Sequence, residues 1–101
     1  MGKALFIAYR STVVATTNRI TINGNRAGSA ADDTTNQMQV PVAGTFSKQA
    51  FRNAGGSGTN TITFRVNGVN ATQVVTKATG VGFAEDAVHT DTIVADDEVN
   101  L

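Results

Sequence analysis

The chain has no cysteine among its 101 residues, no tryptophan, and only one proline, Pro41. The absence of cysteine excludes disulfide bridges, thiolate nucleophiles and zinc sites built on thiolates. Long hydrophobic runs are missing as well: the longest, residues 4–9, is far shorter than the roughly 20 apolar residues of a membrane span. We therefore expect no membrane-spanning segment.

Charged residues are scarce and evenly balanced. They make up 16% of the chain, with 8 Lys and Arg residues against 8 Asp and Glu residues, whereas soluble domains usually contain about 25%. Electrostatic attraction to nucleic acid or to an anionic membrane requires a positive surplus. We therefore expect neither partner, and the zero net charge favours a protein that works inside an assembly.

Thr, Asn, Ser and Gly take the place of the missing charged residues. Thr is β-branched and favours strands, whereas Asn and Gly favour turns. No window shows the apolar spacing of an amphipathic helix, and the length suits one domain. We therefore predict a single all-β domain over residues 1–101, an antiparallel β-sandwich of the jelly-roll type with little or no helix.

Alternating polar and apolar residues recur in short segments, which clusters of Gly, Asn and Asp separate. This pattern is typical of many short antiparallel strands. Residues 1–10 are expected to form a first strand or an N-terminal arm, and the polar, aperiodic residues 26–36 a long loop. Strands are expected at residues 4–9, 19–22, 37–42, 45–53, 61–66, 73–77, 88–94 and 98–101.

The only proline lies within one of these expected strands. Alternation over residues 37–42 would place Met38, Val40 and Val42 on one buried face. Pro41 cannot donate a hydrogen bond to a neighbouring strand, so the strand is expected at a sheet edge, or the proline near a strand end.

The aromatic residues are spread one or two per expected strand, which favours a role in the core over a sugar-binding or base-stacking surface. Phe46 and Phe51 are an odd number of residues apart, so a regular strand would place them on opposite faces. We expect a bulge between them, or a strand buried on both sides. The aromatic residues are Phe6, Tyr9, Phe46, Phe51, Phe64 and Phe83.

Residues 61–66 alternate most cleanly, with their three apolar side chains expected to point inward. Asn67–Gly68 follows, a pair typical of a two-residue type I′ turn because both positions require positive φ. The returning strand is expected at 73–77, which would make the connection wider than two residues. Residues 79–86 are expected to form a loop, and residues 95–97 a turn before the last strand.

His89 is the only histidine, and it could pair with the nearby carboxylate of Asp91. Catalysis would also require a positioned nucleophile and an oxyanion hole, for which the sequence offers no motif. Gly55–Gly58 lacks the lysine of a phosphate-binding loop. We therefore expect no enzymatic activity and no cofactor, and interpret His89 as an exposed or strand-edge residue.

Seven of the eight acidic residues gather in three expected turns, Asp32–Asp33, Glu85–Asp86 and Asp96–Glu98. Aspartate side chains commonly accept hydrogen bonds from the backbone of their own turn. Loop carboxylates can also hold Ca²⁺, but this spacing matches no EF-hand loop. We interpret them as solvated turn residues and expect no metal.

Three segments resemble proteins of tailed-phage virions, a group of β-sandwich capsid decoration proteins and jelly-roll fibre heads. They are Val40–Lys48, with Pro-x-Ala-Gly-Thr and a following Ser; Thr61–Gly68, a strand ending in Arg-x-Asn-Gly; and His89–Asp97, with Val-Ala before an acidic turn. The resemblance covers about Met38 to Leu101 and implies a virion location, a homo-oligomer, often a trimer, and no catalytic site.

Two features depart from this pattern. The usual Gly-Asp step is Asp96–Asp97 here, and chains of this kind usually continue for one or two strands beyond the position of Leu101. A neighbouring subunit could complete the sheet, the sandwich could be shorter, or the sequence could be incomplete at its C-terminus.

The expected function is that of a capsid decoration (cement) protein on the virion surface, bound to the major capsid protein or other virion proteins and stabilising the head through subunit contacts. The alternative is the receptor- or glycan-binding head of a fibre, with exposed side chains at loop tips such as Asn25, Arg26, Asn53, Asn60 and Phe83. The residues expected at the interface are Phe6, Tyr9, Arg10, Pro41, Val99 and Leu101.

Overall fold

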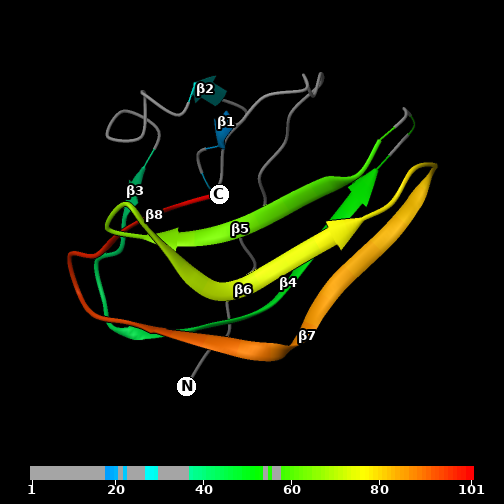
Figure 1. The fold of residues 1–101 in the computed structure, drawn as a ribbon. Coiled ribbons are helices and arrows are strands. Elements are labelled where there is room, and N and C mark those ends of the chain that lie inside the picture. The colour runs from blue at the N-terminus through cyan, green and yellow to red at the C-terminus, as the bar shows by residue number, and fades with distance from the viewer. Residues whose placement is uncertain (1–17, 21, 23–26, 30–36, 54, 56–57) are drawn as a thin grey trace.

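A four-stranded sheet and a two-stranded ribbon form the body of the protein (Figure 1). The computed structural model describes residues 18–20, 22, 27–29, 37–53, 55 and 58–101. The sheet has the order β3-β8-β5-β6, the ribbon pairs β4 with β7, and β1 pairs with β2. The strands are β1 (Asn18–Ile20), β2 (Ala27–Ser29), β3 (Met38–Gln39), β4 (Gly44–Asn53), β5 (Asn60–Val66), β6 (Val69–Lys77), β7 (Gly82–Ile93) and β8 (Glu98–Asn100).

The all-β class is confirmed for these residues, because they contain no helix and all their strand pairs are antiparallel. No helix that could cross a membrane occurs in the described part of the chain. The jelly-roll arrangement and the single domain over the whole length stay predictions.

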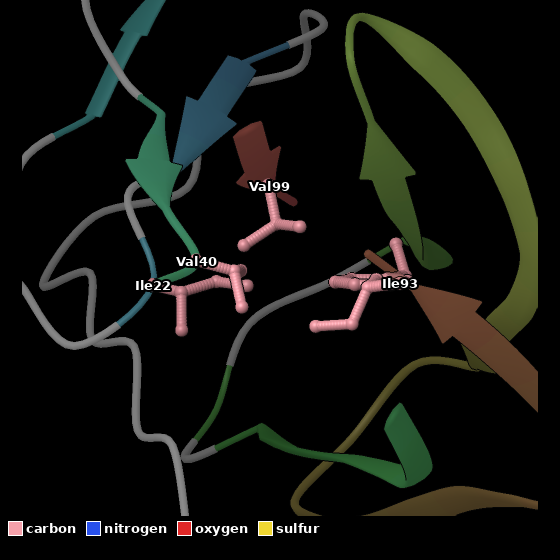
Figure 2. Close-up of a cluster of buried hydrophobic side chains, with 5 residues drawn as sticks. Ile22, Val40, Ile93 and Val99 are labelled. Atoms are coloured by element: carbon pink, nitrogen blue, oxygen red, sulfur yellow. The ribbon is translucent and has the colours of Figure 1, made fainter. Parts of the chain in front are cut away.

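A small hydrophobic core joins the sheet to the ribbon. Phe64 of β5 and Val99 of β8 contribute to it from the sheet, and Ile93 of β7 from the ribbon. Val40 and Ile22 complete the buried cluster (Figure 2). Burial of each such side chain contributes about 1.5–3 kcal/mol. An aromatic pair adds to this contact, since the ring of Phe46 on β4 stacks on Phe64 with the centroids 4.7 Å apart.

The hairpin of β5 and β6 is tighter than the sequence indicated. Asn67 and Gly68 have φ values of 50° and 78°, and Val66 pairs directly with Val69, so the type I′ turn is confirmed. The predicted wider connection is wrong because residues 69–72 belong to β6. A large bulge after the turn interrupts the alternation of polar and apolar residues in this part of β6.

This bulge gives β6 two extra residues. Thr63 pairs with Val74, and the next pair is Arg65 with Asn70. Between these two pairs the chain advances by four residues on β6 but by only two on β5. A bulge of this size bends the strand and leaves backbone groups without a partner across the ladder. The bend of β6 is clear in Figure 1.

The ribbon has a matching bulge in β7. Ser47 pairs with Thr90 and Gln49 with Asp86, so β7 also spends four residues against two. Lys48, opposite the bulge, has a φ of 56°, which is uncommon for a residue with a side chain. The predicted irregularity between Phe46 and Phe51 is confirmed here.

Two strand predictions need correction. The expected strand at 37–42 reduces to Met38–Gln39, and Pro41 lies just beyond its end, as expected for a residue that cannot pair. Val42 is consequently 68% exposed, whereas Val40 is buried. The predicted loop at 79–86 is wrong from Gly82 onward, because these residues pair with β4.

The remaining predictions divide between confirmed and untested segments. The turn at 95–97 and the last strand are confirmed. The inward face of residues 61–66 is confirmed only in part: Phe64 is buried and Val66 packs against the core, but Thr63 and Arg65 are partly buried as well. The loop expected at 26–36 contains β2, and its other residues lie outside the described part, as does the expected strand at 4–9.

The positive φ of Gly68 generates a stability prediction. Gly68→Ala should destabilise the fold by about 1–2 kcal/mol, because a Cβ is disfavoured in this backbone region. Gly44→Ala is the matched control, since Gly44 has no heavy atom within 4 Å of an added Cβ. Urea denaturation measures both variants, and equal stabilities would contradict the assigned turn.

Candidate functional site

Asp91 of β7 binds the backbone of the bulge in β6. Its Oδ1 accepts hydrogen bonds from Thr72 N (2.8 Å) and Thr72 Oγ1 (2.7 Å), and its Oδ2 accepts from Gln73 N (3.0 Å) and Gln73 Nε2 (3.2 Å). One carboxylate thus supplies acceptors for amides that the bulge removes from the strand ladder. Asp91 is only 8% exposed.

Asp86 has a similar role at the bulge in β7. Its Oδ1 accepts from Val88 N (3.1 Å) and His89 N (3.0 Å), and its Oδ2 accepts from Val74 N (3.0 Å) on β6. The same carboxylate therefore closes the bulge of its own strand and holds the neighbouring one. The interpretation of Asp86 as a solvated turn residue is wrong, because it is 7% exposed and lies within a strand.

Gln73 connects the sheet to β4 of the ribbon. Its Oε1 accepts from Gln49 N (3.1 Å), and its Nε2 donates to Phe46 O (2.9 Å) as well as to Asp91. The side-chain amide thus satisfies β4 backbone groups on either side of Lys48. Gln73 is 1% exposed, so these bonds meet the requirement that a buried amide be satisfied.

These contacts keep the two aspartates ionised. The backbone hydrogen bond from His89 is the largest influence that holds the pKa of Asp86 far below its usual range. Bonds from Val74 and from the His89 side chain act in the same direction. Burial raises the pKa of Asp91, but the hydrogen bonds from Thr72 and Gln73 together outweigh it and lower the pKa. The charged carboxylates are therefore part of the folded state.

His89 pairs with Asp86 rather than with Asp91. Its Nδ1 lies 2.8 Å from Asp86 Oδ2, and its side chain is 53% exposed, in agreement with the interpretation of an exposed histidine. A carboxylate on Nδ1 orients an imidazole, but the described contacts bring no nucleophile to the ring. No group of three or more His, Asp or Glu side chains that could hold a metal occurs among the described residues.

A second feature is one end of the molecule, where three connections meet: residues 40–43, 67–69 and 94–98. We call this surface the end platform; it lies on the left of Figure 1. Hydrogen bonds join the three segments to one another. They are Val40 N to Asp97 O, Asp96 N to Val40 O, Asn67 N to Glu98 O, Glu98 N to Asn67 Oδ1 and Asn67 Nδ2 to Asp97 Oδ1.

Asp97 is the central acceptor of the end platform. Its Oδ2 accepts from Val94 N (2.9 Å) and its Oδ1 from Asn67 (2.7 Å). These two bonds, with that from Val94 the larger influence, lower the pKa of Asp97. The neighbouring Asp96 adopts a φ of 73°. The end platform is therefore cross-linked by hydrogen bonds, although it consists of turns.

The end platform carries apolar side chains that are not covered by the described residues. Val42, Val69 and Val94 are 68%, 68% and 59% exposed. Pro41, Ala43 and Ala95 are exposed beside them. Exposed apolar residues on segments that hydrogen bonds join are typical of a protein–protein contact.

The structure separates the residues expected at the interface. Pro41 belongs to the end platform. Val99 is fully buried in the core, so its side chain is turned away from any partner, and Leu101 packs partly against that core. Phe6, Tyr9 and Arg10 lie outside the described residues.

Sequence reasoning did not select Val42 and Val94, because both lie in stretches whose pattern is that of ordinary strands. The only available signal was Pro41, which interrupts pairing beside Val42. The prediction for Phe83 was also wrong, since its ring is 61% exposed rather than in the core.

The contacts of Asp91 generate a second prediction. Asp91→Asn keeps the shape of the side chain but turns one acceptor into a donor that faces backbone N–H groups. We expect a loss of about 2 kcal/mol in the free energy of unfolding. Glu85→Gln, at an exposed position of the same strand, is the control. Equal stability of the two variants in urea would show that Asp91 does not hold the bulge.

The lowered pKa values of Asp86, Asp91 and Asp97 generate a third prediction, on acid stability. An unfolded aspartate has a pKa of about 3.9, so these groups stabilise the fold fully above about pH 5. Below about pH 4 the unfolded chain binds more protons than the folded one, and stability should fall as the pH decreases. Urea denaturation at several pH values measures this, and the acid slope should be shallower for Asp91→Asn. Stability that rises on acidification would contradict the assignment.

No family model, curated protein or solved structure matches the chain. The resemblance to tailed-phage virion proteins therefore rests on the short motifs in the sequence. All three motif segments contribute to the end platform: Pro41 and Ala43 come from the first, Asn67–Gly68 form the β5–β6 turn, and Asp96–Asp97 lie in the turn before β8. The end platform is therefore the surface on which the motifs and the exposed valines coincide.

Proposed function

We propose that the protein is a non-enzymatic structural protein of a tailed-phage virion, a decoration protein that binds the capsid surface and stabilises the head. The observation that carries the proposal is the end platform, on which three valines are held exposed by a network of backbone hydrogen bonds. A contact surface that is already ordered loses little entropy on binding. The motif resemblance supplies the virion context.

The physical reason for such a role is summation. A capsid presents many identical sites, so modest contacts made by each subunit add up to a large stabilisation of the shell. Two valines that become buried contribute about 1.5 kcal/mol each at the lower estimate. Removing both should weaken binding by roughly 100-fold.

The test uses heads that lack the protein. Wild-type protein should bind them and raise the temperature at which they release DNA, whereas the double variant Val42→Ser, Val94→Ser should bind roughly 100-fold more weakly. Val88→Ser is the matched control, because Val88 is 84% exposed and lies away from the end platform.

Two results would overturn parts of this proposal. If wild-type protein neither binds the heads nor protects them, decoration is wrong. If the double variant binds as well as wild type, the end platform is not the surface that contacts the capsid.

A second candidate, the receptor- or glycan-binding head of a fibre, is favoured by one observation. Phe83 is 61% exposed, and its cross-strand partner Arg52 lies on the same outer face of the ribbon. An aromatic ring beside a cationic side chain suits sugar binding. Asn53 and Asn60 are partly buried, and Asn25 and Arg26 lie outside the described residues.

A glycan array separates the two candidates. Binding that Phe83→Ala abolishes would favour the fibre head. Absence of binding by wild-type protein would count against it and leave decoration as the proposal.

A further inference from the structure

Asn67 and Gly68 are a pair of residues that can react with each other without an enzyme. In an Asn-Gly sequence the backbone nitrogen of the glycine can attack the side-chain carbonyl carbon of the asparagine, because glycine has no Cβ to hinder the approach. The pair forms the turn between β5 and β6, and Asn67 is exposed. Water, the only co-reactant that the complete reaction needs, therefore reaches this turn.

The folded state holds the side chain of Asn67 away from this reaction. Its Oδ1 accepts a hydrogen bond from Glu98 N (2.9 Å), and its Nδ2 donates to Asp97 Oδ1 (2.7 Å). The carboxamide is thus directed across the end platform. Attack by Gly68 N requires the carboxamide to turn back over the backbone of its own residue, and both bonds must break for this.

The backbone of the turn is held as well. The N–H of Asn67 donates to Glu98 O (2.7 Å), and the guanidinium of Arg65 donates to Gly68 O. The attacking nitrogen and the carbonyl carbon therefore lie in a turn that is fixed on both sides, and they can meet only when the end platform opens locally.

We propose that Asn67 is a site of spontaneous deamidation, and that closure of the end platform controls its rate. A bond forms between Gly68 N, which gives its proton to the solvent, and Asn67 Cγ. The Cγ–Nδ2 bond breaks, and ammonia leaves. Water then opens the five-membered succinimide ring at either carbonyl, which gives aspartate or isoaspartate without any transfer of electrons. The reaction involves no partner, so this inference does not rest on the proposed function.

Either product damages the turn in which it arises. Aspartate at position 67 has no Nδ2 donor, so its carboxylate would face the carboxylate of Asp97, and like charges repel. Isoaspartate adds a methylene group to the backbone of a two-residue turn, which disturbs the direct pairing of Val66 with Val69. Because the reaction is not reversed in water, a chain that has reacted keeps a weakened end platform.

The first test compares the reaction in folded and unfolded wild-type protein. The sequence contains an internal reference, because Asn23–Gly24 is a second Asn-Gly pair. After incubation at mildly alkaline pH in concentrated urea, mass spectrometry of proteolytic peptides should find both pairs converted at similar rates. In buffer, Asn67 should react more slowly than in urea by a factor of about ten or more, because only chains with an open end platform react.

A second test loosens the end platform without changing the reacting pair. Asp97→Asn leaves one acceptor oxygen where the carboxylate uses two, for Asn67 and for Val94 N. Asn67 should then react about tenfold faster than in wild type in buffer, and at the wild-type rate in urea. Asp96→Asn is the matched control, since it removes the same charge from a side chain that is directed to Gln39 (3.4 Å).

A third test measures what the product does to the fold. Asn67→Asp should raise the unfolding equilibrium constant about tenfold at neutral pH, because a hydrogen bond to Asp97 becomes a contact between two carboxylates. The difference from wild type should shrink below about pH 5, where protonation of one carboxylate restores a donor. Asn70→Asp is the control, since Asn70 Oδ1 only accepts a bond from Arg65. Urea denaturation followed by circular dichroism measures both variants.

The outcomes separate the site from its control by the end platform. No conversion of Asn67 in urea, where Asn23 reacts, would overturn the site itself. Equal rates for Asn67 in buffer and in urea would overturn the control, as would equal rates in the Asp97→Asn and Asp96→Asn variants. None of these measurements uses phage heads, so failure of decoration and failure of this inference are distinguishable.

Discussion

The arrangement of the sheet and the ribbon depends on the hydrogen bonds that two carboxylates of β7, Asp91 and Asp86, accept. Two strands each contain two surplus residues, and such bulges remove backbone N–H groups from regular pairing. Asp91 and Asp86 accept hydrogen bonds from N–H groups of β6 across the gap between β6 and β7, and Asp86 also accepts from His89 N within its own strand. Without an acceptor of this kind, buried amides would each cost about 1–3 kcal/mol.

The same bonds protect the edge of the four-stranded sheet. β6 is the outer strand of its sheet, and an unprotected outer strand can pair with other chains. Here three successive amides, at Thr72, Gln73 and Val74, are occupied by side chains of β7. The bulge bends the edge, and the aspartates of β7 accept the hydrogen bonds of its N–H groups, so the strand is protected.

The sequence pattern predicted the features that depend only on neighbouring residues in the chain. Asn67–Gly68 dictates its own turn, and the spacing of Phe46 and Phe51 indicated the irregularity in the ribbon. The partners of Asp91 and Asp86 could not be found this way, because the bonds join residues distant in sequence and exist only when two bulges lie side by side. Alternation was also misleading at Val42, where Pro41 ends the pairing that the pattern implied.

The end platform depends on distant segments of the chain, and this dependence bears on the proposed role in assembly. Its bonds connect Val40 with Asp97 and Asn67 with Glu98, so it forms only when segments far apart in the sequence have met. Such non-local contacts form late in folding. If the end platform is the contact surface proposed above, a partly folded chain would lack it, and assembly would select chains that have finished folding.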